Sequence, residues 1–303
     1  MTTKDIYAMI EANVVSQLEN GIIPWRRCYH VHGSSLCFSH STGRIYSFLN
    51  QMILGEPGEY WTFNQAKKAG YSIRKGSKAK KVVFWKVLDK ENAREMEDGT
   101  FVGETRSIPY LQWYNVFHES DVEGLPVKPI NGLSEEDRAR KNAESIELAE
   151  RVIADYLSAN KEISVVTRTN ETPSFSPSSN VISILEKCQF DSLAEYYAAF
   201  FHEMVHSTQK ACGREKSTGM HDPRYAKEEL VAEIGAAFLC GYCGITEDMV
   251  IKNNSSYCVS WLGALRNNIQ NLVWASSRAE KAVKYILGDK ADEIFCGGSD
   301  NEV

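Results

Sequence analysis

The feature that most constrains this chain is a His-Glu-x-x-His motif, which spans residues 202–206. Helical spacing of apolar residues predicts a single helix around it, over residues 192–211. Positions i and i+4 lie on one face of a helix, so His202 and His206 can bind one metal ion together. Glu203 then lies beside the open coordination position, where it can act as a general base. The motif therefore predicts a metal centre on a central helix, although two histidines on a helix also occur for packing alone.

A second helical pattern, over residues 227–239, supplies carboxylates for the same ion. Glu229 and Glu233 are one turn apart and share a helix face. We assign Glu229 as the third metal ligand and Glu233 as the acceptor for the outer N–H of a ligand histidine. The reverse assignment remains open, as does a reading in which both are solvated surface glutamates. Two histidines and one carboxylate leave the fourth position of a catalytic Zn²⁺ ion to water, so zinc is the expected cofactor.

Peptide hydrolysis at such a centre also needs a hydrogen-bond donor for the oxyanion. The segment before the second helix offers His221, Arg214 and Tyr225, and the sequence does not separate them. Cys240 and Cys243 form a lone Cys-x-x-Cys pair that continues the helical pattern. Because no second pair accompanies them, packing is favoured over a zinc or redox role.

The remaining sequence excludes several classes of protein. No apolar run approaches the length of a membrane span, and the polar N-terminus leads into an amphipathic helix rather than a signal peptide. The eight cysteines have no regular spacing, as in a chain that keeps its thiols reduced. These features predict a cytoplasmic protein without a membrane partner.

Charge is divided unevenly along the chain. Residues 1–125 carry 15 Lys and Arg against 14 Asp and Glu, whereas residues 126–303 carry 19 against 26. Eight basic residues and no acidic ones fall within Ala66–Lys86. The two halves are therefore expected to bind different partners.

Aromatic residues are interleaved with these cations, which is typical of a surface for single-stranded nucleic acid. Cations follow the phosphates, and aromatic rings stack on unpaired bases. No segment resembles a recognition helix for the major groove. The alternative is that the aromatics form a core and the lysines a solvated face. The residues expected to contact single-stranded DNA are Trp25, Arg26, Arg44, Arg74, Lys75, Lys78, Lys80, Lys81 and Trp85.

The pattern of elements predicts an α+β protein with two domains. Glycine and proline residues indicate a linker over residues 126–136, between an N-terminal module (1–125) and a C-terminal domain (137–303). Expected helices cover residues 4–20, 62–69 and 137–157, with one or two more within 259–287. Expected strands cover residues 72–76, 81–87, 110–117, 162–168 and 180–185, and residues 89–99 are expected to form a hairpin loop or a flexible insertion.

Both halves resemble one known family, the ArdC-type antirestriction proteins. The N-terminal half resembles their single-stranded-DNA-binding domain through Ile23-Pro24-Trp25, Thr42-Gly43-Arg44-Ile45-Tyr46, Asn50, Trp61-Thr62-Phe63-Asn64-Gln65-Ala66, Arg74-Lys75-Gly76 and Val83-Phe84-Trp85-Lys86. The C-terminal half resembles their zincin-like metallopeptidase domain through Phe175-Ser176-Pro177, Tyr196-Tyr197, His202 to His206, Glu229 to Glu233 and Ala236-Ala237-Phe238-Leu239. The chain departs from many relatives at Phe48 and at Ser39-His40-Ser41, which puts detailed DNA contacts over residues 39–50 in doubt.

This resemblance implies a protein of a plasmid, phage or other mobile element that helps incoming DNA escape restriction. One hypothesis is protection by binding single-stranded DNA. The other is an active zinc endopeptidase that cleaves a host protein, with the N-terminal module used only for targeting. In a zincin the strand before the metal helix can add an extended peptide to its edge, so residues 175–185 are the expected substrate edge.

Overall fold

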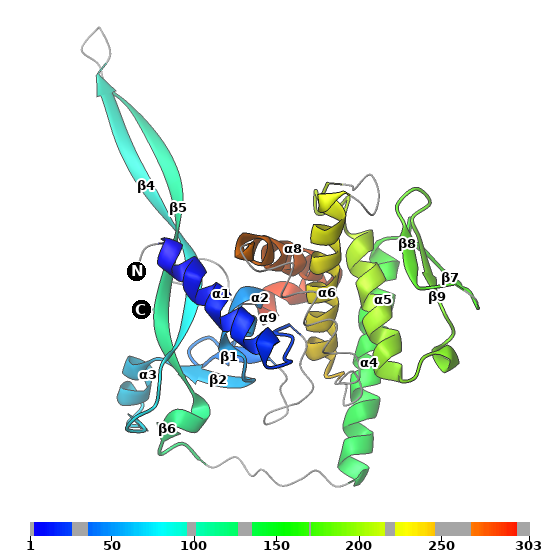
Figure 1. Cartoon of the computed structure of the whole chain (residues 1–303), viewed down its shortest axis with the longest axis horizontal. Helices are drawn as coiled ribbons and strands as arrows, with labels where there is room; N and C mark the ends of the chain where they lie inside the picture. The colour runs from blue at the N-terminus through cyan, green and yellow to red at the C-terminus, as the bar shows by residue number, and fades with distance from the viewer. Residues whose placement is uncertain are drawn as a thin grey trace.

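The chain forms two groups of elements that lie side by side, an N-terminal group around a twisted sheet and a C-terminal group around long helices (Figure 1). The structure is a computed structural model that describes residues 3–25, 36–95, 101–126, 135–169, 171–215, 222–245 and 268–295. Helices and strands mix in the way that the α+β prediction requires. Among these residues, no helix has the length and apolar character needed to cross a bilayer.

Where the structure describes it, the N-terminal group contains three helices: α1 (Thr3–Glu19), α2 (Phe48–Leu54) and α3 (Phe63–Lys68). Helix α1 buries one apolar stripe whose members recur every four residues and are at most 1% exposed: Ile6, Ile10, Val14 and Leu18. Helix α3 begins with a capping box in which the side chains of Thr62 and Gln65 each accept the other's backbone N–H. Local sequence signals therefore explain helices α1 and α3.

The N-terminal sheet has the strand order β1-β2-β5-β4, with bounds Cys37–Ser39, Gly58–Trp61, Phe101–His118 and Lys80–Glu95. Strands β1 and β2 are parallel, and the other two pairings are antiparallel. A second, two-stranded sheet pairs β3 (Ser72–Ile73) with β6 (Val122–Glu123), just after the short 3-10 helix η1 (Glu119–Asp121). This small sheet brings the basic segment after α3 back against the end of β5.

Strands β4 and β5 form a hairpin much longer than the sequence predicts. Their pairing runs from Lys80 opposite Val116 to Glu95 opposite Phe101. The prediction of a loop was therefore wrong for residues 89–95, which continue β4. Figure 1 shows this ribbon projecting beyond the helices. Its backbone pairing does not require the apolar alternation by which strands are recognised from a sequence.

The C-terminal group contains five helices within the described ranges: α4 (Glu135–Ala159), α5 (Leu193–Ser207), α6 (Pro223–Cys243), α8 (Ile269–Leu287) and α9 (Lys290–Ile294). Helix α6 packs against α5 on one side and α8 on the other, with α4 also in contact. The expected helical segment before α8, residues 259–267, lies outside the described residues. Helix α6 is thus the central element of this half.

A three-stranded sheet covers the other side of α5, with the order β7-β9-β8. Its strands are Ser164–Thr167, Val181–Ile184 and Ser174–Ser176 respectively, and the short 3-10 helix η2 (Lys187–Gln189) links β9 to α5. The strand before α5, β9, is paired on both sides, so it cannot add a peptide. The predicted substrate edge is therefore wrong for residues 181–184. Strands β7 and β8 are the outer strands of this sheet, and the outer edge of β8, which packs against α5, is an open strand edge.

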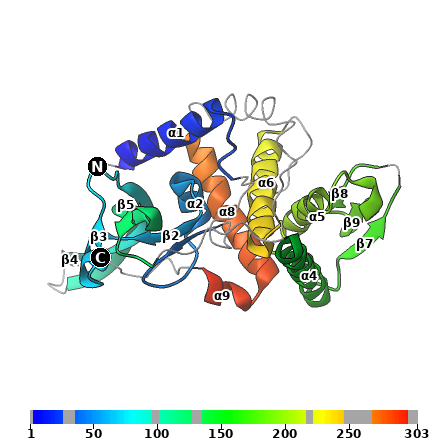
Figure 2. The same ribbon diagram turned by 90° about the horizontal axis from the view of Figure 1, so that it is seen from below.

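The two groups share one core. Phe48 at the start of α2 stacks on Phe238 of α6, with ring centroids 4.0 Å apart, and Phe295 stacks on Phe238 at 5.2 Å. The backbone N–H of Ile45 also donates to the carbonyl of Ile294. Figure 2 shows α8 between α2 and α6, which agrees with the packing of α8 on both. The N-terminal elements therefore pack directly on the helices that carry the metal motif.

Most of the predicted linker, residues 127–134, lies outside the described residues. Helix α4 begins at Glu135, two residues before the predicted helix start, a difference within the ordinary uncertainty of helix ends. The domain limits at residues 125 and 137 remain predictions.

Candidate metal centre

The apolar residues of helix α5 are buried, whereas its two motif histidines are partly exposed. Ser192 caps the helix by accepting the backbone N–H of Glu195. Several of its apolar side chains are fully buried, namely Tyr197, Phe201, Met204 and Val205. The side chains of His202 and His206 are 19% and 16% exposed, so both rings lie at a partly accessible face.

Helix α6 approaches α5 closely because residue 235 is glycine. A Cβ atom at Gly235 would lie 2.8 Å from Cγ2 of Val205, closer than side chains pack. The helix starts at Pro223, with the Asp222 side chain accepting the N–H of Arg224. Close approach in the middle of α6 brings Glu229, nearly two turns earlier, over the histidines.

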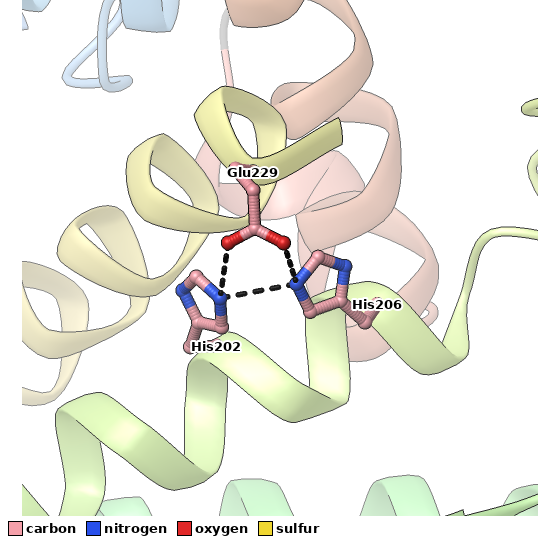
Figure 3. A group of neighbouring side chains, drawn as sticks. All are labelled: His202, His206 and Glu229. Carbon is pink, nitrogen blue, oxygen red and sulfur yellow. Dashed lines mark hydrogen bonds and ion pairs between the residues drawn. The ribbon is translucent and has the colours of Figure 1, made fainter. Parts of the chain in front are cut away.

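His202, His206 and Glu229 converge on one point between the two helices (Figure 3). Their candidate ligand atoms all lie within 4.8 Å of one another. Nε2 of His202 is 3.5 Å from Oε2 of Glu229, Nε2 of His206 is 3.5 Å from Oε1, and the two Nε2 atoms are 3.0 Å apart. Ligands about 2.1 Å from a tetrahedral ion are about 3.4 Å apart, so these three residues fit a small ion of the zinc type. Calcium would require six or more oxygen ligands.

The outer nitrogen of His206 has a carboxylate partner that the sequence analysis missed. Nδ1 of His206 lies 3.3 Å from Oε1 of Glu228. Arg214 donates two hydrogen bonds to the same carboxylate, from Nε to Oε2 and from Nη2 to Oε1, both at 2.9 Å. The Arg214 side chain is only 2% exposed, and it also donates to the carbonyl of Val205 at 2.7 Å. Arg214 is therefore a buried partner of Glu228, which corrects its candidacy as an oxyanion donor.

The role predicted for Glu233 remains a prediction. Its charge acts on His202, the ligand that Glu228 does not contact. Two different carboxylates on α6 thus lie near the two histidines, Glu228 at His206 and Glu233 near His202. The adjacent Glu228-Glu229 pair was the available sequence signal, but the Arg214 partner lies 14 residues away in the chain.

The charges of the centre oppose the effect of burial. Burial alone would lower the pKa of His202, but its hydrogen bond to Glu229 and the nearby charges of Glu203 and Glu233 raise it above its usual value. Burial likewise favours protonation of Glu229, yet His202 and His206 lower the pKa of that carboxyl overall. His202 and Glu229 thus favour each other's charged forms. A bound metal cation would take over the role of the positive charge beside Glu229.

Glu203 is buried at 6% exposure and adjoins both the ligands and the open strand edge. Burial raises the pKa of Glu203, and the charge of Glu229 adds to this shift, while His202 and His206 oppose it. The backbone N–H of Phe175 in β8 donates to its carboxylate. The base and β8, an outer strand of its sheet, therefore lie on the same side of the centre.

Among the remaining oxyanion candidates, Tyr225 has the suitable position. It lies one turn before Glu229, and its hydroxyl hydrogen-bonds to that carboxylate. Burial, followed by the charge of Glu229, raises the pKa of the Tyr225 hydroxyl, so it keeps its proton at neutral pH. His221 lies outside the described residues.

The structure separates the residues predicted to bind DNA into different environments. Trp25 is 7% exposed within the core, which corrects its prediction as an exposed stacking residue. Lys80 donates to the carbonyl of Leu54 at 2.8 Å and to Glu56 at 3.2 Å, so it supports the fold. Lys81 lies over the ring of Trp113, at 5.0 Å.

The other predicted DNA contacts form an exposed group or cannot be placed. Arg44 is half-buried, while Arg26 and the side chain of Trp85 lie outside what the structure describes. Five cations on α3 and the turn after β3 are exposed, and we call them the basic surface: Lys67, Lys68, Arg74, Lys75 and Lys78. The sequence analysis counted all five in its basic segment but named only the last three as contacts.

Cys240 and Cys243 pack within α6. Cys243 is 2% exposed, and burial raises its pKa to about 12, which keeps the thiol protonated and unreactive. Both are free cysteines, in keeping with their interpretation as packing residues.

Two family models match the chain, one over each half. The N-terminal domain of anti-restriction factor ArdC matches residues 4–117, and a zincin-like metallopeptidase matches residues 152–278. A zincin-like domain implies a divalent metal ion, and the convergent side chains described above fit one.

Curated relatives include two proteins from Escherichia coli named DNA primase TraC. They are 25% and 26% identical over 96% of this chain, but the chain spans only 28% and 20% of their lengths. Uncharacterized protein y4eC of Sinorhizobium fredii (strain NBRC 101917 / NGR234) is 25% identical over 96% of this chain and 94% of its own length.

Solved structures of the antirestriction ArdC protein from the R388 plasmid are also similar. The metal-free structure has a TM-score of 0.67 and 26% identity, covering 96% of this chain and 100% of that one. The Mn(II)-bound structure has a TM-score of 0.64 and 24% identity, covering 98% and 99%. The arrangement of both halves is thus the same in outline.

Proposed function

The chain belongs to the ArdC-type family of antirestriction proteins, and we propose that it protects incoming DNA by binding it as a single strand through its N-terminal half. The exposed cations of the basic surface support this proposal, because unpaired cations release counterions when they meet phosphates. Restriction enzymes meet entering DNA in the cytoplasm, which is therefore the proposed site of action. A plasmid or other mobile element is the proposed carrier.

We propose zinc as the metal of the C-terminal half, with His202, His206 and Glu229 as its ligands. Imidazole ligands suit zinc, and three protein ligands leave one position open for catalysis. The carrying observation is the convergence of three ligand atoms within 4.8 Å of one another. A structural zinc site would instead be closed by a fourth protein ligand.

A specific observation favours peptide hydrolysis as a second activity: Glu203 is buried beside the ligands and contacts the open strand edge at Phe175. A zinc ion bound here would supply Lewis acidity toward a peptide carbonyl and a water molecule. Glu203 would accept a proton from that water and pass it to the leaving amine. The Tyr225 hydroxyl would donate to the oxyanion, and β8 would align an extended host polypeptide.

Metal content of purified variants tests the ligand assignment. Glu229→Ala is expected to lose most bound zinc after dialysis, because one of three ligands is gone. Glu203→Gln is expected to retain zinc at the wild-type level, since the side chain is not a ligand. Equal retention in both variants would refute Glu229 as the third ligand and favour Glu233.

The two activities are separated by transfer of an unmodified plasmid into a restricting host, with variants compared at equal expression. The basic-surface variant carries Lys67→Gln, Lys75→Gln and Lys78→Gln. Its control removes the same charge from exposed lysines of the C-terminal half: Lys141, Lys161 and Lys210. Lys80 is left intact because it supports the fold.

Protection lost in the basic-surface variant but retained in its control and in Glu203→Gln would support protection by DNA binding alone. Protection lost in Glu203→Gln, with DNA binding unchanged, would support proteolysis as the mechanism. Protection retained in both variants would refute the proposed function.

A further inference from the structure

The five cations of the basic surface are all exposed to solvent. Within the described part of the chain, no ion pair involves any of its five members. Among the five side chains, only that of Arg74 has a hydrogen bond within the described residues, from Nη2 to the carbonyl of Ser120 at 2.9 Å. The neighbouring acids Asp121 and Glu123 instead accept hydroxyl bonds from Ser77 and Ser72. Net positive charge is therefore left facing solvent.

An exposed aromatic ring lies on the same helix as two of these cations. Phe63 is 56% exposed, the most exposed large apolar side chain in the described ranges. It occupies the first position of α3, and Lys67 lies one turn later on the same helix face. The capping box is built by Thr62 and Gln65, so the ring of Phe63 is not needed to start the helix.

The rings of Trp61 and Tyr71, which flank α3 in the sequence, pack on other residues of the fold, whereas the ring of Phe63 is exposed. Trp61 is 3% exposed and stacks with His40, and Tyr71 packs edge-on against Trp61. Trp61 is therefore closed to a ligand from solvent, and Tyr71 is half-buried against it. Exposing a phenylalanine costs hydrophobic free energy unless a partner covers it.

We propose that Phe63 is the base-stacking platform of this surface, with the five cations of the basic surface tracking the phosphates of a single strand. This inference rests on the proposed DNA binding and names the site that would perform it. A duplex hides its base faces, whereas a single strand offers both a base face and flexible phosphates. Figure 1 shows α3 at the end of the molecule away from α5, so a bound strand would leave the metal centre open.

The test measures binding of a fluorescent single-stranded oligodeoxythymidylate by anisotropy. Stacking on one aromatic contributes enough that Phe63→Leu should weaken binding at least about fivefold. Phe63→Tyr keeps a ring and should bind within about twofold of wild type. Ile22→Ala removes another exposed apolar side chain and serves as the control, with affinity unchanged.

Inorganic polyphosphate, which has charge but no bases, separates stacking from charge. Phe63→Leu should leave polyphosphate binding unchanged, while the basic-surface variant should weaken binding of both polyphosphate and oligonucleotide. Equal oligonucleotide affinity for Phe63→Leu and wild type would overturn the inference but leave the proposed function standing. No binding by the wild-type protein would overturn both, as would a duplex bound more tightly than a single strand.

Discussion

The metal centre and the basic surface both consist of charged side chains, but they hold those charges in opposite ways. At the metal centre, Arg214 and Glu228 are 2% and 10% exposed in their side chains and bind each other in a bidentate pair. On the basic surface, Lys75 and Lys78 are exposed and lack acidic partners within the described residues. Buried charges depend on each neighbour, whereas exposed charges act together through their sum. Substitutions should therefore have large, specific effects in one region and small, additive effects in the other.

Arg214→Met should have the largest effect on stability. It leaves the buried Glu228 carboxylate with only His206 beside it, and breaking a buried charge pair costs about 3–5 kcal/mol. Urea denaturation of the metal-free protein measures the loss without a contribution from bound metal. Arg140→Met removes an arginine whose side chain is 68% exposed, and this control should cost about 1 kcal/mol or less. Equal losses in the two variants would show that burial does not distinguish them.

Gly235→Ala should have an intermediate effect, because the added methyl group meets Val205. Overpacking costs about 1–3 kcal/mol, partly offset by about 1 kcal/mol of helix propensity. Adding Val205→Ala should remove the clash, so the double variant should lose less stability than the sum of the single losses. Additive losses would mean that α6 does not need glycine to approach α5.

The central motif could be predicted because helical spacing alone places His202 and His206 on one face. Glu229 followed from the same reasoning on the next helix. The contacts of Glu228 with His206 and Arg214 could not be predicted. They join residues far apart in the chain through tertiary packing, which local sequence patterns do not indicate. The exposed ring of Phe63 was likewise missed, since the sequence lists aromatic residues without their burial.

The mixed helix-and-sheet fold predicted for the N-terminal half is confirmed, but several particulars are wrong. Trp25 next to two arginines has the composition of an exposed contact, yet it packs in the shared core. Lys80 belongs to a lysine run, yet it is held by Leu54 and Glu56. In the C-terminal half, the substrate edge was wrongly placed on residues 181–184. The order of strands in a sheet depends on how the chain folds back in space, which residue spacing does not reveal.

Single substitutions on the basic surface should have small effects. Lys75→Gln should change the free energy of unfolding by less than about 0.5 kcal/mol, since the side chain is exposed and unpaired. It should reduce the slope of log affinity against log salt concentration for single-stranded DNA by about 0.7. Binding titrations at several salt concentrations measure that slope, and an unchanged slope would remove Lys75 from the phosphate contacts.

Glu150 on α4 lies between the two extremes, because it is about half exposed yet has two partners. Its carboxylate pairs with Lys187 and accepts the hydroxyl of Tyr197 at 2.7 Å. Burial opposes ionisation, but these two partners lower the pKa of Glu150 below its usual value. A pKa lower in the folded state stabilises the protein above the unfolded-state value, and this contribution disappears as pH falls through the folded-state pKa.

The stability lost in Glu150→Gln should therefore depend on pH and should become smaller in acid. The difference from wild type should be present above about pH 5 and shrink steadily below about pH 4. Thermal unfolding across that range measures it. Glu147→Gln, one turn earlier on α4 and 74% exposed, is the control that should show a smaller difference. A difference for Glu150→Gln that stayed constant with pH would mean that Glu150 stabilises the fold by packing and not by its charge. Partial exposure would then be enough to remove the dependence on charged neighbours that we expect at the buried metal centre.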